Sequence, residues 1–320
     1  MSVRVAVVGY GVMGRYHAMN YGALAGAELV GVVDPDPDKR LAAQLELGVA
    51  AYPSVAALLQ ARAVDAASVA APTSLHYALT KQLLTAGVHV LVEKPVATDV
   101  AQARELAELS RGLGLVLQVG HITRFYRSVA KLSEEVDRPY LIEARRLVPS
   151  TRVKDVGVIL DLMIHDIDIV LGLVDGEPVK VSALGRCLNG SPHEDVAAAQ
   201  VLFEDGCIAR LLASRVAPDA ERSLLVAERD RTVRVDFAKE PYAEVVVYRD
   251  PGGAPSNGHV QLDRHVIHEE NPLKKELEHF LARQAGEAAP IGTLADDLRS
   301  LTLASRLLAE MRAARGVVTV

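Results

Sequence analysis

The beginning of the sequence places strong limits on how this chain folds. The apolar run Val3–Val8 leads directly into Gly9-Tyr-Gly-Val-Met-Gly14, a helical stretch follows, and a second apolar run ends in Asp34. A strand, a glycine-rich turn, a helix and a second strand make up a βαβ unit, which builds parallel sheet. The sequence therefore predicts an N-terminal Rossmann domain with a doubly wound parallel sheet.

Each glycine of this turn has a physical role in binding a dinucleotide. Gly9 permits the tight turn, Gly11 lets the backbone approach a pyrophosphate, and Gly14 lets the helix pack close to the sheet. The helix N-terminus offers amides to the phosphates, and Asp34 can accept hydrogen bonds from a ribose while repelling a 2′-phosphate. The alternative is a glycine-rich turn without a ligand. We predict NAD rather than NADP as cofactor, bound through Asp34 and through Gly9, Tyr10, Gly11, Val12, Met13 and Gly14.

The pattern of the chain changes near residue 120. Up to there, short apolar strands alternate with helices, whereas longer alternating strands with hairpin turns follow between Tyr140 and Tyr248. A chain of 320 residues is also long for one hydrophobic core. We predict a dinucleotide-binding domain over residues 1–120. Residues 121–320 would form an α+β domain with a large, mostly antiparallel open sheet, whose final helix, 293–315, can pack back on the first domain.

Two strand ends of the first domain carry candidate site residues. Val88–Val92 reads as a buried strand that ends in Glu93-Lys94-Pro95, and the carboxyl edge of a parallel sheet is where such folds bind ligands. Lys94 is therefore a candidate ligand-binding ammonium, although a lysine can also extend from a strand end into solvent. At another strand end, Pro72, Thr73 and His76 are expected to line the nicotinamide side. His76 would contact the cofactor ribose or pack on its own helix.

A helix in the second half carries an acid and a histidine. Within the apolar stretch from Gly157, Asp161 and His165 are four residues apart and so share a helix face. A carboxylate beside an imidazole can orient it as a proton acceptor. One alternative is a capping or core ion pair. A metal site that adds Asp168 is disfavoured because no further ligand cluster is evident, so no metal is predicted.

Composition excludes several classes of function. Half of the residues are hydrophobic, which excludes a disordered protein, and the net charge of −6 argues against nucleic acid as a partner. No long uncharged apolar run is present, so no membrane association is expected. Cys187 and Cys207 lie in no zinc-binding pattern, which indicates a reducing environment. We expect a soluble, non-exported, cytoplasmic protein.

The three motifs together resemble the family of glucose–fructose oxidoreductase, inositol dehydrogenase and MocA. The resemblance rests on the turn Gly9–Gly14, on Glu93-Lys94-Pro95 and on the pair Asp161 and His165, and it spans essentially the whole chain. It implies an enzyme that oxidises a CH–OH group with a nicotinamide cofactor, and a homodimer or homotetramer built through the C-terminal sheet. It also implies that Lys94 stabilises the developing alkoxide, that His165 removes the hydroxyl proton, and that Asp161 orients the site or relays the proton. Glu93 would lie beside the cofactor.

Longer stretches look like one branch of that family. Val119–Phe125, Asp161–Asp168 and Glu270–Phe280 are similar to the branch that oxidises the 3-hydroxyl of UDP-N-acetylglucosamine on the route to a 3-amino sugar for lipid A. The sequence departs from it at Tyr126, where that branch commonly has asparagine and then proline. The alternatives are a dehydrogenase of a free polyol or sugar and a non-catalytic NAD-binding protein. The substrate would contact Lys94, His121, Arg124, Arg152, Asp161 and His165.

The charge of one segment is compatible with an anionic substrate. From Gly120 to Lys154 the chain has eight basic residues against four acidic ones, in a chain that is negative overall. Arginine suits bidentate contacts to phosphate, which makes Arg124 and Arg152 candidates for binding a diphosphate. The alternative is an ordinary solvated basic face.

Overall fold

The computed structural model of the chain describes residues 2–150, 153–188, 190–239, 241–249 and 261–315. Its contacts divide the chain into two compact units, Met1–Ile122 with Asn271–Leu298, and Thr123–Glu270 with Arg299–Val320. This grouping adds residues 271–298 to the first unit, whereas the sequence assigned them to the second domain. The division into domains at residue 120 stays a prediction.

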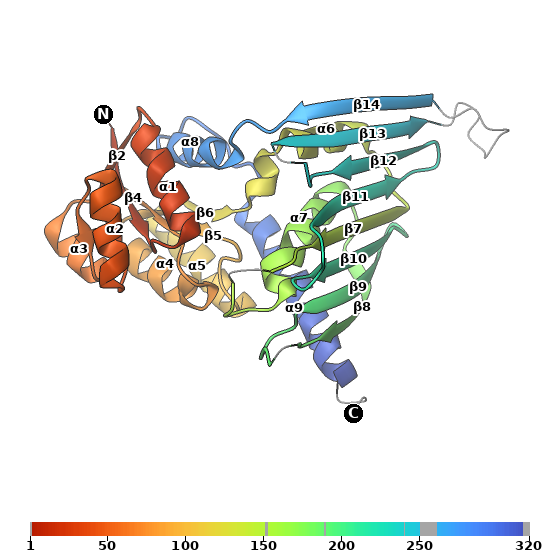
Figure 1. Ribbon diagram of the computed structural model, residues 1–320, viewed down its shortest axis with the longest axis horizontal. Coiled ribbons are helices and arrows are strands. Elements are labelled where there is room, and N and C mark those ends of the chain that lie inside the picture. The colour runs from red at the N-terminus through yellow and green to blue at the C-terminus, as the bar shows by residue number, and fades with distance from the viewer. Residues whose placement is uncertain (1, 151–152, 189, 240, 250–260, 316–320) are drawn as a thin grey trace. The chain divides into compact units, whose positions relative to one another are not determined.

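A six-stranded parallel sheet forms the centre of the first unit, with helices on both faces (Figure 1). The strand order is β3-β2-β1-β4-β5-β6, which reverses direction between β1 and β4, and a doubly wound sheet binds its ligand at such a reversal. The predicted Rossmann sheet is confirmed. The strands are β1 (Val3–Val8), β2 (Ala27–Val33), β3 (Ala51–Tyr52), β4 (Ala66–Val69), β5 (His89–Glu93) and β6 (Leu117–Gly120).

The helices of this unit begin and end where the local sequence dictates. Ser54 and Asp99 cap the starts of two helices by accepting hydrogen bonds from backbone amides. Gly48 ends a third helix and Gly114 ends the helix that Asp99 begins, with φ of 66° and 65°. The helices are α1 (Val12–Ala23), α2 (Pro37–Leu47), α3 (Val55–Ala61), η1 (Thr73–Leu75), α4 (His76–Thr85), α5 (Val100–Leu113) and α8 (Pro272–Gln284).

Packing explains why α8 groups with the first unit. Leu277 and Phe280 are fully buried and belong to the same hydrophobic cluster as Val5, Tyr21 and Leu91. The apolar face of α8 thus completes a core that begins in β1, more than 250 positions earlier. Because α8 and β1 lie so far apart in the chain, the order of the sequence does not show that they belong to one core.

An eight-stranded, mostly antiparallel sheet dominates the second unit, as predicted. Its order is β14-β13-β12-β11-β7-β10-β9-β8, and only β7 and β10 pair in parallel. Its strands are β7 (Leu141–Leu147), β8 (Pro178–Arg186), β9 (Val196–Phe203), β10 (Ile208–Ser214), β11 (Glu221–Ala227), β12 (Arg231–Asp236), β13 (Tyr242–Arg249) and β14 (Gln261–His268). The sequence did not predict β14, because this edge strand carries charged residues on both faces and has no fully buried position.

One face of this sheet is covered and the other is open. Along β9, Ala197, Ala199 and Val201 are buried, while Ala198, Gln200 and Leu202, which alternate with them, are exposed. Helices pack on the covered face, where α6 contacts β12, β13 and β14, and α7 contacts β7. The remaining helices are η2 (Ile122–Phe125), α6 (Arg127–Glu135), the π-helical segment η3 (Ile159–Met163), α7 (Ile164–Leu173) and α9 (Leu294–Arg315).

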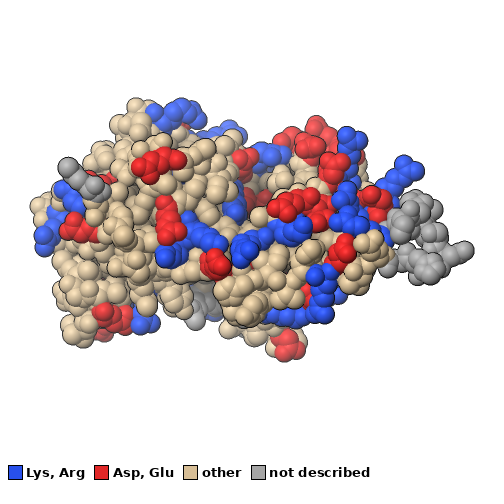
Figure 2. Space-filling view, turned by 90° about the horizontal axis from the view of Figure 1, so that it is seen from above, with Lys and Arg blue, Asp and Glu red and all other residues tan. Residues whose placement is uncertain are grey.

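Charged groups of both signs are interspersed over the face of the molecule shown in Figure 2. Among the helices that the structure describes, none is long and apolar enough to cross a membrane. The segment Pro251–Gly258, which is rich in proline and glycine, lies outside the described residues.

Candidate active site

The glycine turn after β1 has the geometry that a dinucleotide requires. Gly9 has a φ of 95°, and a Cβ there would lie 2.6 Å from the carbonyl oxygen of Ala70. A Cβ on Gly14 would lie 1.7 Å from the carbonyl oxygen of Gly9, so helix and turn touch backbone to backbone. Gly11, in contrast, has no atom within 4 Å of such a position, and no side chain caps the start of α1. Open space above uncapped amides fits a pyrophosphate.

Asp34 lies at the carboxyl end of β2 with a buried carboxylate. Its two oxygens accept hydrogen bonds from the backbone amides of Tyr10, at 2.8 Å, and Asp36, at 2.9 Å. The Nζ of Lys39 lies 3.7 Å from Oδ2, and Arg40 donates to the carbonyl oxygen of Asp34. The acid predicted to select the cofactor is therefore tied to the glycine turn and has two cations beside it.

The strand ends after β4 and β5 are joined by His76. Pro72 precedes η1, Thr73 is buried within it, and His76 is buried at the start of α4. The Nδ1 of His76 lies 2.7 Å from the carbonyl oxygen of Pro95, and its Nε2 lies 2.9 Å from that of Ala71. Burial lowers the pKa of this imidazole. Its ring nitrogens face backbone carbonyls, while the contact with the cofactor ribose stays a prediction.

Lys94 follows β5 directly and is half-buried. The peptide bond between Lys94 and Pro95 is cis. The Oε1 of Glu93 lies 2.9 Å from Nε2 of the fully buried His17. Burial alone would raise the pKa of Glu93, but the hydrogen bond from His17 and the nearby charges lower it. Glu93 and Lys94 thus place an acidic and a basic residue at consecutive positions at the end of β5.

In the second unit, Asp161 and His165 lie on one continuous helical segment. Asp161 is buried within η3, a turn with π-helical hydrogen bonding, and His165 is half-buried in the first turn of α7. Such π turns occur frequently at functional sites. The predicted single helix is thus a π turn that continues into an α-helix. Because it carries two of the residues predicted to be catalytic, we call this segment, residues 159–173, the catalytic helix.

Two buried ion pairs hold the catalytic helix to its own unit. Arg146 on β7 binds Asp166 through Nε, 3.1 Å from both carboxylate oxygens, and through a second nitrogen at 2.6 Å. Arg124 binds Asp168 at 2.9 and 2.6 Å, and the hydroxyl of Ser300 donates to the same carboxylate at 3.0 Å. The sequence did not identify Arg146 or Asp166 as part of the site. Arg124 as a ligand of a diphosphate stays a prediction, and Arg152 lies outside the described residues.

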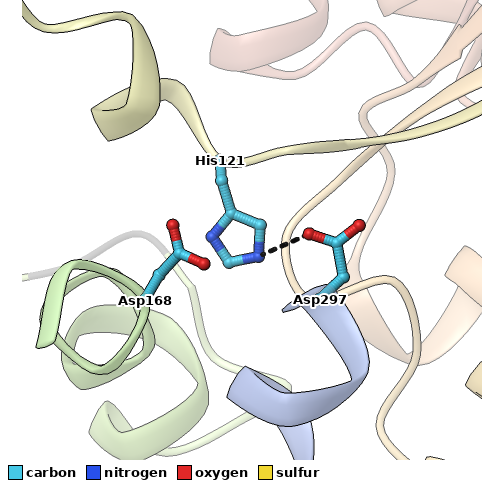
Figure 3. Close-up of side chains that lie close together, drawn as sticks. All are labelled: His121, Asp168 and Asp297. Carbon is cyan, nitrogen blue, oxygen red and sulfur yellow. Dashed lines mark ion pairs between the residues drawn. The ribbon is translucent and has the colours of Figure 1, made fainter. Parts of the chain in front are cut away.

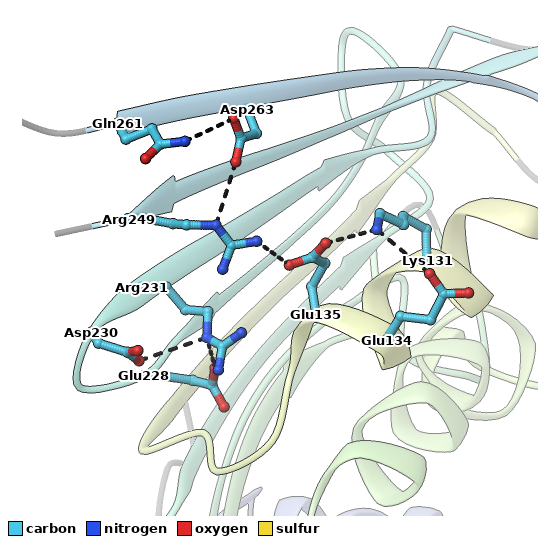
Figure 4. A network of polar contacts seen from close by, with 9 residues as sticks. All are labelled: Lys131, Glu134, Glu135, Glu228, Asp230, Arg231, Arg249, Gln261 and Asp263. Carbon is cyan, nitrogen blue, oxygen red and sulfur yellow. Dashed lines mark hydrogen bonds and ion pairs between the residues drawn. The ribbon is translucent and has the colours of Figure 1, made fainter. Parts of the chain in front are cut away.

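Acidic residues from distant parts of the second unit face the basic segment 120–154. Arg145 binds Glu221, Arg127 binds Glu269 through its backbone amide, and Lys131 binds Glu135 at 2.7 Å. Glu135 also binds Arg249 in the network shown in Figure 4. The count along segment 120–154 included Glu135 but missed Glu221 and Glu269, because folding brings these two from later in the chain.

His121, the remaining predicted substrate ligand, is buried at the end of β6. Its Nε2 lies 3.7 Å from a carboxylate oxygen of Asp297, and both residues belong to the first unit (Figure 3). Each unit by itself thus assembles part of the predicted site. The cofactor residues and Lys94 lie in the first, and Asp161 and His165 lie in the second.

Comparisons with known proteins identify relatives along the whole chain. Residues 3–121 match the model of an oxidoreductase family with an NAD-binding Rossmann fold, and residues 134–237 match the model of the Gfo/Idh/MocA C-terminal domain. The UDP-N-acetylglucosamine 3-dehydrogenase of Acidithiobacillus ferrooxidans is 36% identical over 87% of this chain and 88% of its own length. A solved structure of that enzyme has a TM-score of 0.87 and 32% identity, covering 98% of this chain and 99% of its own. The scyllo-inositol 2-dehydrogenase (NAD(+)) of Bacillus subtilis is 30% identical over 68% of each chain.

Proposed function

Because the chain belongs to the Gfo/Idh/MocA oxidoreductase family, whose enzymes act on CH–OH groups, we propose that it is an NAD-dependent dehydrogenase of UDP-N-acetylglucosamine. The product would be the 3-keto sugar nucleotide. The observation that carries this proposal is the match to UDP-N-acetylglucosamine 3-dehydrogenase over nearly the full length of both chains. The position of Lys94 after β5 and of Asp161 and His165 on one helical segment supports the same chemistry.

The proposed roles follow from the chemistry of each side chain. NAD, which the glycine turn and Asp34 would hold, would supply the acceptor for the hydride of the ring carbon that carries the reacting hydroxyl. His165 removes the proton of that hydroxyl as a general base, and Asp161, one turn earlier, orients the imidazole or passes the proton on. Lys94 donates to the hydroxyl oxygen and stabilises the negative charge that develops on it.

The test is formation of NADH by the purified protein with UDP-N-acetylglucosamine, inositol and free sugars offered in parallel. We expect turnover with the nucleotide sugar. Replacing His165 with Asn should lower turnover by about 10²–10⁴-fold, the usual contribution of a general base, with unchanged affinity for NAD. His268→Asn is the matched control, because His268 is exposed on β14. Full turnover by H165N would show that His165 is not the general base.

Asp34 supports NAD as the cofactor, although Lys39 and Arg40 lie beside its carboxylate. A 2′-phosphate would meet the Asp34 carboxylate, which the amides of Tyr10 and Asp36 fix in place. We expect tighter binding of NAD than of NADP in calorimetric titrations, and Asp34→Ser should reduce the difference between the two affinities. Preference of the unaltered protein for NADP would overturn this choice.

The second candidate function is oxidation of a free polyol. The match to scyllo-inositol 2-dehydrogenase favours it, at lower identity and over a smaller part of the chain. Lys94, Asp161 and His165 would have the same roles on either substrate. Activity with inositol and none with the nucleotide sugar would establish this alternative.

The open face of the eight-stranded sheet is the surface through which we expect a homodimer or homotetramer to form. Leu184 is 68% exposed there, and Leu202 and Ile208 are 38% and 44% exposed. Leu202 and Ile208 pair across neighbouring strands, and exposed apolar groups on an open sheet favour burial against another copy. Sedimentation should therefore detect a dimer or tetramer, which Leu184→Glu should dissociate.

A further inference from the structure

The start of the catalytic helix lacks a capping group of its own. Val158 occupies the N-cap position and its side chain cannot accept a hydrogen bond, although the first amides of a helix need acceptors. Glu194, which precedes β9, supplies one, because its Oε1 accepts a hydrogen bond from the amide of Ile159 at 3.1 Å. The carbonyl oxygen of Glu194 also accepts from the amide of Val158 at 3.1 Å. Glu194 is 3% exposed.

The carboxylate of Glu194 explains why residue 157, just before the helix, is a glycine. A Cβ on Gly157 would lie about 2.0 Å from the carboxylate carbon and oxygens of Glu194. The φ of Gly157 lies outside the left-handed region, so the backbone itself would accept a side chain. The carbonyl oxygen of Gly157 in turn accepts a hydrogen bond from the amide of Asp161 at 3.0 Å. The carboxylate of Glu194 thus lies against Gly157, and Gly157 in turn binds the backbone amide of Asp161.

The next residue, Asp195, fixes the loop that leads into this helix. Its carboxylate binds Nε of the buried Arg215 at 2.6 Å and the amide of Leu188. Arg215 in turn donates to the carbonyl oxygens of Val153 and Val156, at 3.1 and 3.0 Å. Two consecutive acids before β9 therefore hold both the loop and the first turn of the helix.

We propose that Glu194 is a positioning residue for the reaction, which caps the catalytic helix and sets the place of Asp161 through Gly157. This inference rests on the proposed function for the role of Asp161. The negative charge of the cap also lies at the positive end of the helix dipole, which favours it. All of these contacts lie within the second unit.

The test is a double-mutant cycle on turnover. Glu194→Ala removes the cap and should lower kcat by about tenfold to a hundredfold, as displacement of a catalytic group does, with unchanged affinity for NAD. Gly157→Ala should do similar harm in the unaltered protein but add little in the Glu194→Ala background, where its Cβ has space. Glu194→Gln keeps an acceptor for Ile159 and should recover most of kcat. Glu221→Ala, which removes a partly exposed carboxylate from β11, is the matched control.

A second measurement does not depend on the substrate. Hydrogen exchange without ligand should show faster exchange of the amides at 158–163 in Glu194→Ala than in Glu221→Ala. This result would hold even if UDP-N-acetylglucosamine were the wrong substrate. The proposal is overturned if Gly157→Ala lowers kcat equally in both backgrounds, or if exchange of this segment is unchanged.

Discussion

The glycine turn after β1 and the catalytic helix reach their geometry by different means. In the turn, Gly9 and Gly14 leave no space for a side chain, so backbone contact with backbone fixes the shape. The catalytic helix is fixed by side chains, through the ion pairs of Asp166 and Asp168 with Arg146 and Arg124. The turn is therefore sensitive to added atoms, whereas the helix is sensitive to removed charges.

The largest effect should come from breaking the pair between Arg146 and Asp166. Arg146→Met leaves a buried carboxylate without its partner, which costs about 3–5 kcal/mol of unfolding free energy. The double variant Arg146→Met with Asp166→Leu removes both charges and should recover much of that loss. Urea unfolding at neutral pH measures both values. Equal losses in the single and double variants would show that charge is not what holds this helix.

A smaller effect is expected from adding one methyl group to the turn. Gly14→Ala places Cβ against the carbonyl oxygen of Gly9, and overpacking of this kind costs about 1–3 kcal/mol. Binding of NAD should be lost in calorimetric titration. Gly11→Ala meets no protein atom and should keep full stability while it weakens dinucleotide binding. If both glycine variants are equally stable, contact of backbone with backbone is not what fixes the shape of the turn.

The ion pairs of the second unit should also make its stability depend on pH. Burial by itself would raise the pKa of Asp195, but the amide of Leu188 and the charge of Arg215 lower it below its ordinary value of 3.8. A lowered carboxyl pKa contributes stability that is present above that value and lost as the pH falls through the folded-state pKa. Urea midpoints measured through this acid range should fall less steeply for Asp195→Asn. If the midpoints of Asp195→Asn and of the unaltered protein fall equally steeply with pH, the lowered pKa of Asp195 is not the source of the acid sensitivity.

The smallest effect is expected from an ion pair at the surface of the first unit. Arg4 binds Asp65 at 2.6 Å, but both side chains are substantially exposed to solvent, which screens their attraction. Arg4→Gln should leave the thermal midpoint unchanged within the error of calorimetry. A loss comparable with that of Arg146→Met would mean that burial does not distinguish the two pairs.

The difference between the glycine turn and the catalytic helix also decides how much of each could be predicted from the sequence. The glycine turn and Asp34 belong to a recurrent strand–turn–helix–strand pattern, so their spacing along the chain was sufficient to predict their arrangement, although Asp34 binds the amide of Tyr10, 24 positions away. The family, the parallel sheet and the mostly antiparallel sheet were predicted correctly for the same reason.

Partners far apart in the chain could not be predicted. Arg146 and Asp166 are 20 positions apart, and Arg124 and Asp168 are 44 apart, so neither pair follows a local pattern. The same holds for Glu194 and Ile159, which lie 35 positions apart. Strand β14 was missed because an edge strand that alternates poorly between apolar and polar residues resembles a loop.

The π turn at Ile159–Met163 has a consequence for any change in the length of the chain. A π turn contains about one residue more than an α turn, and each residue of an α-helix advances the direction of its side chain by about 100°. The π turn takes up its extra residue within one revolution, so deleting one residue other than Asp161 between 159 and 163 would leave a regular α turn with the amide of Ile159 and His165 still in phase. The extra residue is thus spare chain length, and a deletion of this kind should be tolerated far better than a deletion in the α-helical residues 164–173, which would rotate the two ends by about 100°.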